Sequence, residues 1–89
     1  MAVRRRVVVH GRVQGVFFRD STERMAYSTG VSGWVRNRND GAVEAVFEGE
    51  PDAVDRMVAW SRQGPRRAVV ERVEVFDEEP VGESAFRVR

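Results

Sequence analysis

The hydrophobic positions of this chain change their spacing along the sequence, and the changes divide it into predicted strands and helices. Residues 5–11 are rich in valine and alternate weakly, which predicts a first strand, because β-branched side chains favour extended backbone. The same reasoning predicts four further strands, at residues 32–38, 42–48, 69–76 and 85–88. In the strand at 42–48, Val43, Ala45 and Phe47 share one face and two glutamates share the other. We expect the apolar face to line the core.

Two helices are predicted between these strands. The first begins at Asp20, because Asp20 and Glu23 have the spacing of a capping box, and Gly30 ends it. The second begins at Pro51, a residue favoured in the first turn of a helix, and the Gly-Pro pair at 64–65 ends it. Its predicted core-facing stripe consists of Val54, Met57, Val58 and Ser61.

The predicted order of elements is β-α-β-β-α-β followed by a short fifth strand. This order is typical of the ferredoxin-like α+β fold, an antiparallel sheet with two helices on one face. Asn39-Asp40-Gly41 predicts a hairpin between the second and third strands. In this topology the first and second strands run parallel, with the third between them. Their carboxyl ends therefore lie at one edge of the sheet, which brings the loop after residue 11 close to Asn37.

Composition changes this picture mainly by exclusion. A chain of 89 residues corresponds to a single domain, residues 1–89. The net charge of +1 gives no overall field that would favour nucleic acid or a membrane, so an anion site must depend on local charge. We expect Arg4, Arg5 and Arg6 to form a solvated strand edge.

There is no cysteine, which excludes disulfides and thiolate nucleophiles, and no His or carboxylate cluster has metal-ligand spacing. The apolar stretch near the N-terminus is too short for a signal peptide, so we expect a cytoplasmic protein.

Residues 11–19 combine two glycines with an arginine directly before a predicted helix. Glycines let backbone N–H groups turn inward to form an anion-binding concavity, and a helix N-terminus adds unpaired donors. The guanidinium of Arg19 can make bidentate contact with phosphate oxygens. We interpret the loop as a phosphate site; an ordinary strand-to-helix loop with a surface arginine is the alternative. The carboxylates of Asp20 and Glu23 oppose anion binding, and we expect them to point away from the loop.

The loop has no side chain that could attack phosphorus. Val13 stands where a cysteine phosphatase has its nucleophile, and the lysine of a nucleotide-binding P-loop is missing. Water must then be the nucleophile. Asn37 is the candidate to position it, because its amide accepts a hydrogen bond from water, donates one to phosphate and carries no repelling charge. The alternative is that Asn37 is only a turn residue at a strand end.

Two stretches of the chain resemble the signatures of the acylphosphatase family. Gly11-Arg12-Val13-Gln14-Gly15-Val16-Phe17-Phe18-Arg19 resembles the first, and Gly33-Trp34-Val35-Arg36-Asn37 with Asp40-Gly41-Ala42-Val43-Glu44-Ala45 resembles the second. Ala26, Gly30 and the Gly64-Pro65 break match as well, so the resemblance covers nearly the whole chain. It implies that Arg19 binds the phosphoryl oxygens and that Asn37 orients the attacking water. The implied phosphate-binding residues are Gln14, Gly15, Val16, Phe17, Phe18 and Arg19.

The resemblance implies a monomeric enzyme that hydrolyses acyl phosphates to carboxylate and inorganic phosphate without a metal or cofactor. One alternative is a non-catalytic phosphate- or anion-binding domain of the same fold, which would not need Asn37. Another is an RNA-binding module, but residues 42–49 hold only one aromatic side chain, Phe47, and it is predicted to face the core. A related domain also occurs within larger carbamoyl-transfer maturation proteins, whereas the single domain predicted for this chain favours the free-standing enzyme.

Overall fold

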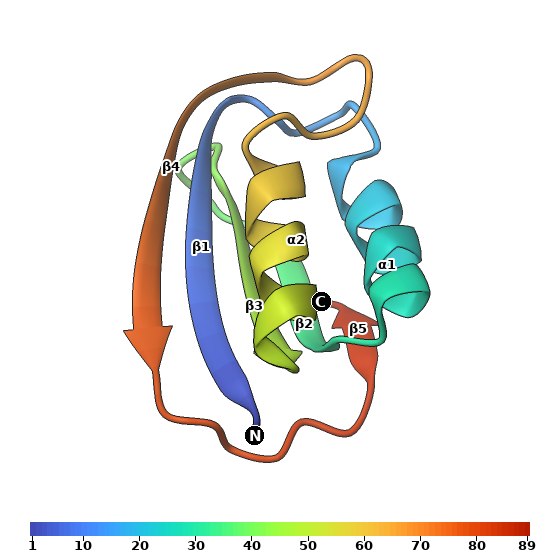
Figure 1. The fold of residues 1–89 in the computed structure, drawn as a ribbon. Helices are drawn as coiled ribbons and strands as arrows, with labels where there is room; N and C mark the ends of the chain where they lie inside the picture. Colours follow the sequence, from blue (N-terminus) through green and yellow to red (C-terminus); the bar gives the residue numbers. More distant parts are fainter.

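The computed structural model describes residues 1–89 and contains five strands and two helices (Figure 1). In chain order they are β1 (Val3–Arg12), α1 (Phe18–Thr29), β2 (Ser32–Asn37), β3 (Val43–Gly49), α2 (Pro51–Ser61), β4 (Val69–Glu78) and β5 (Phe86–Val88). The predicted elements are all present, and most of their ends differ from the prediction by one or two residues. The two helices lie side by side against one face of the sheet (Figure 1).

The strand order in the sheet is β4-β1-β3-β2-β5. β3 pairs antiparallel with both β1 and β2, so these two strands run parallel on either side of it, as the topology predicted. The ferredoxin-like α+β fold is therefore confirmed. The short β5 adds to the outer edge of β2 in parallel, which makes the five-stranded sheet mixed at that edge. The carboxyl ends of β1 and β2 lie at the same edge of the sheet.

The core lies between the sheet and the helices. Val43, Ala45 and Phe47 of β3 are all at most 2% exposed and face this layer, which confirms the predicted apolar face. The predicted stripe on α2 is also confirmed, because Val54 and Met57 are fully buried and Val58 packs against the core. Valines from β1 and β2 complete the core, and they suit a sheet because their restricted χ1 fits extended backbone.

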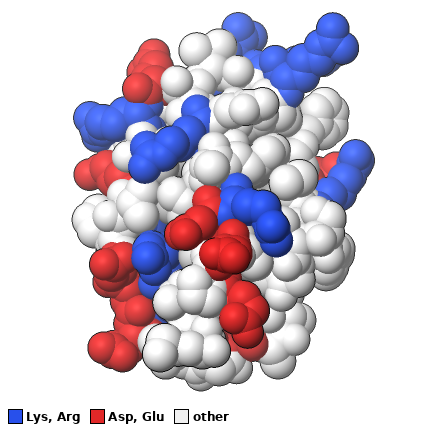
Figure 2. Space-filling view, viewed as in Figure 1, with Lys and Arg blue, Asp and Glu red and all other residues white.

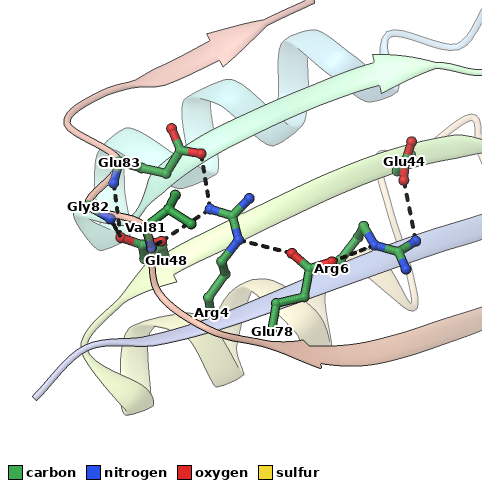
Figure 3. Close-up of polar contacts among 8 residues, drawn as sticks. All are labelled: Arg4, Arg6, Glu44, Glu48, Glu78, Val81, Gly82 and Glu83. Carbon is green, nitrogen blue, oxygen red and sulfur yellow. Dashed lines mark hydrogen bonds and ion pairs between the residues drawn. The ribbon is translucent and has the colours of Figure 1, made fainter.

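The opposite face of the sheet carries a network of ion pairs (Figure 3). Arg4 is only 9% exposed and contacts Glu48, Glu78 and Glu83, at 3.0–3.1 Å between guanidinium nitrogen and carboxylate oxygen. Arg6 contacts Glu78 in the same network, together with Glu44 of β3. The expectation of a solvated strand edge is wrong for Arg4. β1 is an inner strand between β4 and β3, so its outward side chains meet carboxylates from both neighbours.

Helix α1 begins two residues earlier than predicted, and the capping box does not form. The residue before the helix is Phe17, whose backbone is left-handed with φ of 64°, and no side chain caps the first turn. Asp20 instead lies within the helix and pairs with Arg24 one turn later, at 2.9 Å. The left-handed turn at Phe17 starts the helix without a polar cap. The helix end is as predicted, since Gly30 has φ of 80° and donates its N–H to the carbonyl of Ala26.

Candidate active site

The loop between β1 and α1 starts from a close approach of two strands. The β1–β4 register shifts between His10 and Gly11, and a Cβ on Gly11 would collide with the carbonyl oxygen of Val69. Gly33 of β2 is in the same situation against the carbonyl of Val46. Both glycines have φ near 130–140°, where other residues are strained. They keep β1 and β2 tightly paired to their neighbours, just ahead of the ends that carry the site.

Residues 14–19, called the cradle loop from here on, leave a row of backbone N–H groups without partners. Gly15 and Phe17 are left-handed, with φ of 73° and 64°, and such alternation turns successive N–H groups to one side. Backbone hydrogen bonds outside the helices and strands include none donated by Gly15, Val16 or Phe17. The first bond donated by α1 comes from Ser21, to the carbonyl of Phe17, and no side chain caps the helix. The N–H groups before Ser21 are therefore available to an anion.

The side chain of Gln14 fixes the cradle loop to the β2–β3 turn. Its Nε2 donates to the carbonyl of Arg38 at 2.8 Å and to that of Ala42 at 3.0 Å. The turn is itself held by Asp40, whose carboxylate accepts the N–H of Ala42 at 3.1 Å and contacts Arg38 at 2.9 Å. The hydrogen bond from Ala42, aided by Arg38, lowers the pKa of Asp40 below its usual range. The loop after β1 and the end of β2 are thus linked directly.

Phe18 anchors the other end of the cradle loop in the core. Its ring is 3% exposed and packs against Trp60 of α2, with ring centroids 5.4 Å apart. A Cβ on Gly64 would lie 2.6 Å from the ring, so the chain after α2 also closes over Phe18. Residues on either side of the unpartnered N–H groups are therefore fixed by packing, and the concavity does not depend on a ligand for its shape.

A cavity of about 410 Å³ opens beside this loop, at the edge of the sheet where β1 and β2 end. Its lining includes Gly15, Phe17, Phe18, Arg19 and Asn37, so the two predicted catalytic residues meet at one cavity although 18 positions separate them in the sequence. The guanidinium of Arg19 takes part in no ion pair of the protein. Asn37 is the last residue of β2 and follows Val35 on the face toward the helices.

Two of the predicted phosphate-binding residues do not line this cavity with their side chains. The side chain of Gln14 is used for the link to the turn, and Val16 is 6% exposed and belongs to the core. Only their backbone N–H groups can take part in the cradle. Glu23 does not line the cavity, as expected, but Asp20 does. Its charge is opposed by Arg24, which lies one turn along the same helix.

Sequence reasoning missed Val88, which also lines the cavity. Val88 belongs to β5 and pairs with Val35 of β2, so the C-terminal strand forms one wall of the site. No local signal marks this role, because it depends on the parallel pairing of β5 with β2. No group of three or more His, Cys, Asp or Glu side chains could hold a metal ion.

Comparison with known proteins identifies the family. The acylphosphatase family model matches residues 5–88. An acylphosphatase of Rubrobacter xylanophilus is 63% identical over 86 residues, covering 94% of this chain and 77% of that protein. One of Gloeobacter violaceus is 56% identical over 87 residues, covering 98% and 94%. The solved structure of an acylphosphatase from Coxiella burnetii has a TM-score of 0.95 at 39% identity, covering 99% of this chain and 93% of that one.

The chain belongs to the acylphosphatase family, a family of hydrolases. The family that the sequence resembled is therefore confirmed. The shared fold extends over almost the full length of the solved relative, so the cavity and the strands that form it are part of the matched region. Neither helix has the length and apolar character needed to cross a membrane.

Proposed function

We propose that this protein hydrolyses acyl phosphates, the mixed anhydrides of a carboxylic acid and phosphoric acid, to a carboxylate and inorganic phosphate. The observation that carries the proposal is a convergence at one cavity in a member of the acylphosphatase family. Backbone N–H groups without partners, an arginine without an ion pair and a neutral amide all reach that cavity. Residues 1–89 act as one domain in this proposal.

The phosphoryl group binds in the cradle loop. Backbone N–H groups of residues 14–19 donate to its oxygens, and the positive end of the α1 dipole adds to the attraction. The guanidinium of Arg19 contacts two phosphoryl oxygens at once, a geometry that suits its planar fork. These donors are held by the packing of Phe18 and by Gln14 before substrate arrives, so little reorganisation is needed as charge develops on the oxygens.

Water attacks phosphorus from the side of Asn37. The amide oxygen of Asn37 accepts a hydrogen bond from the water and holds it in line with the bond that breaks. The link between Gln14 and the β2–β3 turn supports this role, because it couples the position of Asn37 to that of the cradle loop. The P–O bond to the carboxylate breaks, the carboxylate leaves with the electron pair, and a phosphoryl oxygen takes the proton that the attacking water loses. A carboxylate is a weak base, so its departure needs no strong general acid.

We propose that the reaction is independent of metal ions. The positive charge that a metal would supply to the phosphoryl oxygens comes instead from Arg19 and the backbone dipoles of the cradle loop. Purified protein should release phosphate from acetyl phosphate at the same rate before and after dialysis against a strong chelator. A large loss restored by one divalent ion would overturn this mechanism.

The second candidate is a non-catalytic anion-binding domain with the same fold. The cradle loop and Arg19 would serve such a domain equally well, but Asn37 would have no part in it. The assay with acetyl phosphate separates the two, because a binding domain retains phosphate and shows no turnover.

The protein acts as a cytoplasmic monomer in this proposal, on a small-molecule substrate and without nucleic acid. Support for the monomer comes from the core, in which Phe47 and Met57 are fully buried within a single chain. The near-zero net charge of +1 supports the absence of a nucleic-acid partner. Sedimentation equilibrium of the purified chain tests the oligomeric state.

A further inference from the structure

A second cavity of about 450 Å³ adjoins the first and shares the residues Phe17 and Asp20 with it. It lies between the first turns of α1 and the segment that follows α2, where Pro65, Arg66 and Arg67 line it. In Figure 1 this segment arches next to the cradle loop at the top of the molecule. A group bound in the first cavity can therefore extend into the second without leaving the surface of the protein.

The second cavity is basic. Three arginines line it, Arg24, Arg66 and Arg67, against the single carboxylate of Asp20. Asp20 contacts Arg24 at 2.9 Å, whereas Arg66 and Arg67 are exposed and take part in no ion pair of the protein. Figure 2 shows arginine side chains gathered at the upper end of the molecule, over this same segment. Two guanidinium groups next to the substrate cavity thus have no internal partner.

The wall between the two cavities is apolar at Phe17. This side chain is 70% exposed, because the left-handed backbone at Phe17 directs it outward from the core. Together with Pro65 it offers an apolar surface between the cradle loop and the two arginines. A ligand that fits this sequence of surfaces has a phosphoryl group, then a short aliphatic stretch, then an anionic group.

The direction of the reaction leads to the same side. Asn37 lines the first cavity only, and the proposed water lies beside it. In an in-line displacement the leaving carboxylate departs on the far side of phosphorus from the water. The acyl group is therefore directed away from Asn37. The second cavity adjoins the first at Phe17 and Asp20 and is not lined by Asn37, so it can receive the acyl group.

We infer that Arg66 and Arg67 form a subsite for a second anionic group on the acyl part of the substrate. This inference rests on the proposed function and narrows it, because it favours acyl phosphates of dicarboxylic acids, or acyl phosphates that also carry a phosphate ester, over those with a neutral tail. The two arginines bind the remote anion as charge-assisted hydrogen-bond donors, and the bond that breaks remains at the cradle loop.

The test compares butyryl phosphate with succinyl phosphate, which have the same number of carbons and differ in the terminal carboxylate. Wild-type protein should show a higher kcat/KM for succinyl phosphate, mainly through a lower KM. In the double variant Arg66→Gln/Arg67→Gln the ratio of the two kcat/KM values should fall about fivefold or more, on the scale of two exposed ion pairs. The preference should also weaken as ionic strength rises.

The matched control is Arg56→Gln/Arg62→Gln, which removes the same charge from two exposed arginines that line neither cavity. Its ratio should equal that of the wild type. Equal losses for both substrates in the Arg66→Gln/Arg67→Gln variant, or the same fall in ratio in the control, would overturn the subsite. Failure of the wild type to hydrolyse either substrate would instead reject the proposed function, and the subsite with it.

Discussion

At the level of single residues, the arginines of this protein fall into two groups. Arg4 and Arg6 are held by carboxylates on the open face of the sheet. Arg19 lines the first cavity and takes part in no ion pair, so its donors remain free for a ligand. A guanidinium is more weakly hydrated than the ammonium group of lysine and keeps a fixed fork of donors, so it binds phosphoryl oxygens better than lysine does. These features support the proposal that Arg19 binds the phosphoryl group of the substrate.

Replacing Arg19 by lysine tests whether the fork matters or only the charge. Arg19→Lys keeps the positive charge but loses the bidentate geometry, so charge on the phosphoryl oxygens is matched less well. We expect kcat/KM to fall about 100-fold or more, with losses in both binding and chemistry. Steady-state kinetics with acetyl phosphate provide the measurement. Kinetics close to those of the wild type would exclude the bidentate contact.

Asn37 should affect turnover more than binding. Asn37→Ala removes the group that positions water and leaves the cradle loop intact, so phosphate affinity measured by calorimetry should be retained. Turnover should fall about 100-fold or more. Asn37→Asp should also weaken phosphate binding, because a carboxylate next to a phosphoryl dianion adds repulsion. If affinity and turnover fall in equal proportion in Asn37→Ala, the residue binds the ligand and does not orient water.

At the level of elements, the site depends on the contact between one loop and one turn. Gln14 ties the cradle loop to the β2–β3 turn through two carbonyl groups, those of Arg38 and Ala42. Both carbonyls also accept backbone N–H groups within the turn, from Gly41 and Arg38 respectively. Loss of the Gln14 side chain therefore leaves neither carbonyl without a partner, and its main effect should be on the position of the loop.

Gln14→Ala should lower the free energy of unfolding by about 1–2 kcal/mol, the scale of two net hydrogen bonds. The kcat of the variant should also fall, about tenfold or more, because the phosphoryl group and the water are no longer held in fixed alignment. Urea denaturation and the acetyl phosphate assay measure the two quantities. Gln63→Ala is the control, since Gln63 is exposed and its side chain makes no hydrogen bond. Loss of stability in Gln14→Ala without loss of kcat would contradict the positioning role.

At the level of the whole molecule, a buried carboxylate connects the sheet to the C-terminal strand. Glu48 of β3 is 5% exposed and accepts the backbone N–H groups of Val81, Gly82 and Glu83, at 2.8–3.0 Å, and it also contacts Arg4 (Figure 3). These bonds hold the connection between β4 and β5 against the sheet. Since β5 carries Val88 to the cavity, Glu48 supports one wall of the site from a distance.

The pKa of Glu48 predicts how stability responds to acid. Burial by itself would raise this pKa. The hydrogen bonds from Val81 and Arg4, together with those from Glu83 and Gly82, outweigh burial and lower the pKa. A lowered pKa in the folded state contributes stability at pH values above the pKa of the unfolded chain, about 4.3. That contribution is lost as the pH falls below this value and through the folded-state pKa.

Glu48→Gln should therefore lower the free energy of unfolding at neutral pH by about 1–3 kcal/mol, because it removes a charged acceptor of several hydrogen bonds. The difference from the wild type should shrink as the pH is lowered below about 4. Denaturant titrations at a series of pH values measure it. Glu79→Gln, which removes an exposed glutamate without an ion pair, should match the wild type throughout. A difference for Glu48→Gln that is constant with pH would refute the assigned pKa shift.

The sequence by itself determined the features that depend on near neighbours. The alternation of valines, the hairpin signal at Asp40-Gly41 and the helix end at Gly30 each depend on a few adjacent residues, and the structure agrees with all three. Together they determine the order of elements. The order in turn brings the cradle loop and Asn37 to one edge of the sheet, which is why the sequence alone predicts the candidate site.

The tertiary structure decided what depends on distant neighbours. Arg4 is buried because β1 is an inner strand, which no local pattern shows. Its partners Glu48 and Glu78 lie 44 and 74 positions away in the sequence. Asp20 lies inside the helix because α1 begins after a left-handed Phe17, two residues earlier than the capping pattern predicts. Val88 lines the cavity only because β5 pairs in parallel with β2. Burial and pairing are properties of the packed chain, so a short sequence pattern leaves them open.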